Sequence, residues 1–102
     1  MNTINSLQVY LMTLSVVQPA RIQDIEKGSY LLFGRKVIEE IGLDSLRRTH
    51  ELARKNELVI AVRRGSYCVS RSGASIIRRG KISSQIDNRR LFLMKKERRN
   101  LN

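Results

Sequence analysis

The sequence has few of the residues from which catalytic and metal sites are built. It contains one histidine (His50), one cysteine (Cys68) and no tryptophan. A single cysteine excludes an intramolecular disulfide and a clustered thiolate metal site, and we expect Cys68 to be a packed, inert thiol. No GxSxG, HExxH, CxxC or phosphate-loop motif is present. We therefore expect no catalytic residues, no metal, no cofactor and no small-molecule effector.

Long hydrophobic runs are also missing. No run is long enough to cross a bilayer, and the first residues, MNTINSLQVYLMTL, lack the basic leading segment of a secretory signal. We therefore expect a cytoplasmic location and no membrane partner. With 102 residues, of which 41% are hydrophobic, the chain is long enough for one domain with a core of modest size.

Acidic residues are scarce, and the basic residues are unevenly distributed. Twenty Lys and Arg oppose nine Asp and Glu, which gives a formal charge of +11. Residues 1–43 carry four bases and four acids, residues 44–70 carry six and three, and residues 71–102 carry ten and two. All of the excess charge therefore follows Leu43. This asymmetry favours a polyanionic partner, with nucleic acid ahead of anionic membrane, and a solubilising tail is the alternative.

The first part of the chain has apolar residues at helical spacing. Over 6–17 they form one stripe, and Pro19 ends this helix because the residue before a proline is displaced from the α region. A second helix is expected over 20–27, where Gly28 ends it. The interval 28–43 predicts a further helical segment.

The next helix, expected over 44–56, has the most basic face in the first two-thirds of the chain. Asp44 or Ser45 is its expected N-cap. The expected inward stripe consists of Leu46, Thr49, Leu52 and Ala53. The opposite side carries Arg47, His50, Glu51 and Arg54, flanked by Arg48 and Lys55. His50 has no partner at metal-ligand or catalytic spacing, so we expect it at the helix surface.

The hydrophobic period then changes from 3.6 to 2. Two short strands, LVIAV and SYCVS, are joined by RRG, which predicts a β-hairpin with Arg63 and Arg64 near its tip. We expect Tyr67 and Val69 to anchor this hairpin in the core. Helical character returns after Gly73. The sequence thus predicts a mostly α fold with a small β-hairpin.

The stretch ELARKNELVIAVRRGSYCVSRSG, residues 51–73, resembles the end of a winged helix-turn-helix domain. In that superfamily a recognition helix runs into a Leu-Val pair, and a hairpin wing with a basic, glycine-containing tip follows. A tyrosine, an aliphatic residue, a serine or threonine and a glycine come next. The matching residues here are Leu58, Val59, Arg63, Arg64, Gly65, Tyr67, Val69, Ser70 and Gly73. The resemblance is to small prokaryotic and mobile-element transcriptional regulators, and it covers roughly residues 6–77.

This resemblance implies a winged-helix DNA-binding domain over 1–78 and a basic C-terminal helix over 79–102. Members of the superfamily usually connect the second helix to the recognition helix by a short turn, whereas about sixteen residues, 28–43, intervene here. Either the domain carries an inserted helix, or 35–42 is the second helix and 20–27 is additional.

The resemblance also implies a transcriptional regulator that binds double-stranded DNA in the nucleoid, with its recognition helix in the major groove and its wing on the backbone. The expected base contacts are Arg47, Arg48, His50, Glu51 and Arg54. Glu51 either accepts a hydrogen bond from a cytosine amino group or orients Arg47 or Arg48. The expected backbone contacts are Ser45, Lys55, Arg63, Arg64 and Ser66. Two alternatives stay open: an RNA- or ribosome-associated protein with the same fold, and a winged-helix protein-interaction module.

An apolar run near the C-terminus, Leu91, Phe92, Leu93 and Met94, lies between two basic pairs. It either closes the domain core or forms a dimerisation surface, and a membrane-binding amphipathic helix is a third option. Regulators of this superfamily are commonly dimers, so we expect a homodimer.

Overall fold

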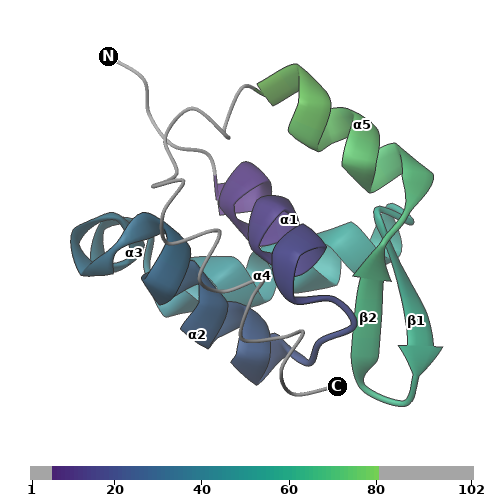
Figure 1. Ribbon diagram of the computed structural model, residues 1–102, viewed down its shortest axis with the longest axis horizontal. Helices are drawn as coiled ribbons and strands as arrows, with labels where there is room; N and C mark the ends of the chain where they lie inside the picture. Colours follow the sequence, from purple (N-terminus) through teal and green to yellow (C-terminus); the bar gives the residue numbers. More distant parts are fainter. Residues whose placement is uncertain (1–5, 81–102) are drawn as a thin grey trace.

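The computed structural model describes residues 6–80, which fold into helices around one antiparallel hairpin (Figure 1). The elements are α1 (Ser6–Val17), α2 (Ile22–Phe33), α3 (Arg35–Ile41), α4 (Leu43–Lys55), β1 (Val59–Arg63), β2 (Ser66–Val69) and α5 (Arg71–Gly80). The prediction of a mostly α fold with a small β-hairpin is confirmed for this part of the chain.

Helix α1 lies at the centre of the core. It packs against α2, α4, α5 and β2, and Figure 1 shows it in the middle of the molecule with α4 behind it. The sequence predicts one buried stripe, yet Val9 and Val16, outside that stripe, are buried together with Tyr10 and Leu14. A helix that is apolar on most of its sides can be covered from several directions, and here four elements cover it.

Helix α2 continues through Gly28, so the predicted end of the helix at that glycine is wrong. Gly28 is itself buried, and the turn after it buries Leu32 and Phe33. A glycine inside a helix costs about 1 kcal/mol relative to alanine, which the burial of these two large side chains outweighs. The helix ends at Gly34, whose φ of +88° favours glycine.

The additional helical segment predicted within 28–43 is the second half of α2 followed by α3. Helix α3 is a seven-residue helix between two glycines with positive φ, Gly34 and Gly42. It contacts α2 and α4. Helix α2 is longer than α3 and packs on both α1 and α4.

Helix α4 begins one residue earlier than predicted, with Gly42 in place of Asp44 or Ser45 at the N-cap position. Its buried residues are Leu46, Thr49, His50 and Ala53. The expected inward position of Leu52 is wrong, because this side chain is 52% exposed. The four buried residues follow the i, i+3, i+4, i+7 spacing of one helical face. His50, and not Leu52, is therefore the fourth member of the inward stripe.

The hairpin pairs Val59 with Val69 and Ala61 with Tyr67, and its register shifts before Arg63. Two residues, Arg64 and Gly65, connect the strands, and Gly65 has a φ of +77°. Ala20, just before α2, pairs with Tyr67 through two backbone hydrogen bonds of 3.0 and 2.9 Å. This pairing holds the start of α2 beside the hairpin.

Helix α5 starts at Arg71, so the predicted return of helical structure only after Gly73 is too late. Ser70 joins the hairpin to this helix, because its Oγ donates to the Glu57 carbonyl at 2.8 Å and accepts from the Gly73 N–H at 3.1 Å. The domain boundary drawn between 78 and 79 falls inside α5. The apolar run Leu91, Phe92, Leu93 and Met94, and with it the predicted dimerisation surface, lies outside the described residues.

Candidate nucleic-acid interface

The exposed face of α4 carries half of the side chains predicted to contact DNA. Packing of the opposite stripe on the core leaves one charged surface, made of Asp44, Arg47, Arg48, Glu51, Arg54 and Lys55. Of these, Arg48, Glu51, Arg54 and Lys55 line one shallow depression together with Leu52. Four bases and two acids leave this face positive.

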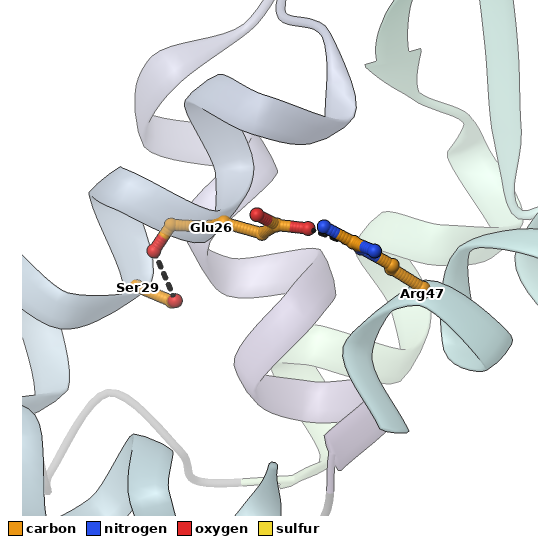
Figure 2. A network of polar contacts seen from close by, with 3 residues as sticks. All are labelled: Glu26, Ser29 and Arg47. Carbon is orange, nitrogen blue, oxygen red and sulfur yellow. Dashed lines mark hydrogen bonds and ion pairs between the residues drawn. The ribbon is translucent and has the colours of Figure 1, made fainter. Parts of the chain in front are cut away.

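Arg47 is held by a residue that sequence reasoning missed. Its Nε donates to Oε1 of Glu26 on α2 at 2.9 Å, as Figure 2 shows. The Arg47 side chain is 64% exposed, whereas that of Glu26 is only 15% exposed. The hydrogen bond and the charge of Glu26 raise the pKa of Arg47 above its usual value. Because the two residues are 21 positions apart in the sequence, no local sequence pattern predicts this pair.

Glu51 pairs with Arg54 instead of orienting Arg47 or Arg48. The Arg54 Nη1 lies 3.5 Å from Oε1 of Glu51, and both side chains are largely exposed. The guanidinium carbon of Arg54 also lies 5.4 Å from the centre of the Tyr67 ring, a distance at which a cation and an aromatic face attract. Arg54 therefore connects the helix to the hairpin.

His50 is a core residue, so its predicted position at the helix surface is wrong. Its Nδ1 lies 2.5 Å from the Tyr10 hydroxyl, and its ring meets Tyr67 edge-on with centroids 4.8 Å apart. The residue is 7% exposed, and burial lowers the pKa of its imidazole. With its ring in contact with two tyrosines, His50 is not among the side chains that we propose for base contact.

The predicted backbone contacts divide into exposed and half-buried residues. Lys55 at the end of α4 and Arg63 and Arg64 on the hairpin are exposed. Ser45 and Ser66 are half-buried, and the Ser45 carbonyl already accepts a hydrogen bond from the Thr49 hydroxyl at 2.7 Å.

A groove of about 490 Å³ lies between the start of α2, α4 and the tip of the hairpin. Its lining residues are Arg21, Ile22, Gln23, His50, Glu51, Arg64, Gly65 and Tyr67. Two arginines from distant parts of the chain, Arg21 and Arg64, thus share one concave surface. Sequence reasoning missed Arg21, because only the pairing of Ala20 with Tyr67 brings it to the hairpin.

Among residues 6–80, no group of three or more His, Cys, Asp and Glu side chains is placed to hold a metal ion. None of the helices in the same range has the length and apolar character needed to cross a membrane. Comparison of the chain with protein-family models, with curated proteins and with solved structures finds no significant match.

Proposed function

We propose that this chain is a small winged-helix protein that binds double-stranded DNA and regulates transcription, with α4 as its recognition helix. The observation that carries this proposal is the position of a basic, exposed helix face next to a hairpin with two exposed arginines. An α-helix fits the major groove of B-DNA, where each base pair presents its own pattern of donors and acceptors. Arginines on an adjacent hairpin can then reach the phosphates.

The residues divide by where their side chains lie. Arg47 and Arg48, in the first half of α4, are proposed to contact base edges, as N-terminal residues of recognition helices do. Glu51 lines the groove next to the hairpin, and Arg54, paired with Glu51, lies against Tyr67 of the hairpin. The proposed phosphate contacts are Ser45, Lys55, Arg63, Arg64 and Ser66, and we add Arg21, which lines the groove with Arg64.

Binding measured against salt tests this function directly. The protein is titrated with random DNA duplexes, with duplexes selected from a random library and with structured RNA, each at several salt concentrations. We expect a selected duplex to bind at least tenfold more tightly than random DNA, because each correct base pair contributes about 1–3 kcal/mol. Equal affinity for every duplex would contradict sequence recognition, and a preference for structured RNA would favour the RNA-binding alternative.

The double variant Arg63→Ala/Arg64→Ala is expected to weaken binding to all duplexes and to reduce the salt dependence. Each lost phosphate contact removes about 0.9 from the slope of log K against log salt, so the slope should fall by roughly 1.8. The matched control is Arg35→Ala/Lys36→Ala, which removes the same charge from α3, at the end of the molecule opposite the hairpin in Figure 1. If both variants change the slope equally, the hairpin does not lie on the phosphates.

A further inference from the structure

The ion pair between Glu26 and Arg47 differs from the other ion pairs of the described residues. Arg35–Glu39 and Arg54–Glu51 each lie within one helix, and their side chains are 49 to 85% exposed. Such pairs contribute little, because water screens both charges. The Glu26–Arg47 pair joins two helices, and the Glu26 side chain is mostly buried while the Arg47 side chain is mostly exposed.

Glu26 is therefore a buried hydrogen-bond acceptor for an exposed side chain. Figure 2 shows the Glu26 carboxylate extending from α2 toward the guanidinium of Arg47 on α4. The carboxylate accepts from Nε, so the N–H groups of Nη1 and Nη2 remain for a ligand. These two nitrogens can donate a pair of parallel hydrogen bonds to O6 and N7 of a guanine.

We propose that Glu26 is a positioning residue that determines the base preference of Arg47. The inference rests on the proposed DNA-binding function and adds a residue on a different helix to it. Without Glu26, Arg47 samples many rotamers and can reach phosphates as readily as base edges. With Glu26, the end of its guanidinium is held in one orientation before DNA arrives, so less side-chain entropy is lost on binding.

No acidic residue of α4 offers the same support. Glu51 lies beside Arg54. Asp44 also raises the pKa of Arg47 through its charge, but its effect is smaller than that of Glu26, which accepts the hydrogen bond from Nε. Because Glu26 brings a negative charge to a surface that faces a polyanion, its removal should not weaken non-specific binding. A loss of base preference without a loss of non-specific affinity is therefore the effect that separates a positioning role from a merely structural one.

The experiment selects preferred duplexes with the wild-type protein and then measures base preference, position by position, for four single variants and one double variant. Arg47→Ala identifies the base pair that Arg47 contacts. Glu26→Ala should reduce preference at that same base pair about threefold to tenfold, the loss expected when one side chain is no longer held in place. Glu26→Gln, whose amide oxygen can still accept from Nε, should lose less. Glu39→Ala removes the same charge from α3 and should leave the preference unchanged.

Melting temperatures of all variants are measured in parallel. A variant that is partly unfolded is recognised by a lower melting temperature together with equally weakened binding to all duplexes. The double variant Glu26→Ala/Arg47→Ala should lose no more preference than Arg47→Ala. The proposal is overturned if Glu26→Ala leaves the preference as Glu39→Ala does, or if it affects a different base pair from Arg47→Ala. A wild-type protein that selects no sequence overturns DNA recognition itself, and this role with it.

Discussion

Gly73→Ala is expected to lower the free energy of unfolding by about 3 kcal/mol, the upper part of the range for overpacked cores. A Cβ at this position would lie 2.3 Å from the Leu58 carbonyl oxygen and 2.9 Å from Cγ1 of Val69. The Leu58 oxygen cannot move away freely, because it accepts the Ser70 N–H at 2.9 Å. Alanine is the better helix former by about 1 kcal/mol, so a net loss would show that the close approach dominates. Thermal unfolding should show a fall in Tm of at least about 10 °C.

Two alanine variants serve as controls for Gly73. Ser72→Ala, at an exposed position of the same helix, should change stability by less than about 0.5 kcal/mol. Gly65→Ala, at the hairpin tip, meets no atom within 4 Å but has a φ of +77°, so it should cost about 1 kcal/mol. A Gly73→Ala protein as stable as Ser72→Ala would show that α5 does not pack this closely against the hairpin.

Stability is expected to fall as the pH drops below about 6.5, because His50 is buried as a neutral ring. It is the only histidine in the chain. Burial lowers its pKa in the folded state, with Arg54 also lowering it and Glu51 opposing, so the unfolded chain takes up the proton first. The contribution of neutral His50 to the free energy of unfolding is therefore complete above about pH 7. As the pH falls, it decreases by up to about 1.4 kcal/mol per pH unit, until the lower pKa of His50 in the folded state is reached. Urea unfolding at half-unit steps from pH 8 to 5 measures this slope.

His50→Gln is the control for the pH dependence. Its side chain does not titrate, and the amide oxygen can accept from the Tyr10 hydroxyl, which now lies against Nδ1 of the histidine. The variant should be less stable than the wild-type protein at pH 7, but its free energy of unfolding should not change between pH 7 and 5.5. The same decrease in the variant and the wild-type protein would show that other groups cause the acid sensitivity.

Helix ends illustrate how far local sequence can predict this fold. The hairpin and the existence of α1 and α4 follow from hydrophobic period, so the sequence predicts them nearly in place. The glycines do not reveal their roles in the same way. Gly28 lies inside α2 and Gly34 ends it, because burial of Leu32 and Phe33 favours continuing the helix past the first glycine. That burial depends on the core around α1, which no local window contains.

The candidate interface shows the same division. Its exposed arginines, among them Arg48, Arg63 and Arg64, are predictable because a helix face and a hairpin tip are visible in the sequence. Whether the His50 side chain points into the core or to the surface cannot be predicted from the sequence, because its position on the helix lies at the border between the charged and the buried side. Packing against Tyr10 and Tyr67 places it in the core.

The sequence by itself therefore determined the helices with strong periodicity, the hairpin, the excess of positive charge and the residues that carry it. Only the tertiary structure decided which of those charged side chains are paired with an acidic partner and which lie side by side. Glu26 on α2 accepts a hydrogen bond from Arg47 on α4, and the pairing of Ala20 with Tyr67 brings Arg21 and Arg64 to the same groove. The physical reason is range: hydrophobic period and turn residues act over a few positions, whereas these contacts join residues more than twenty positions apart and exist only once the core has formed.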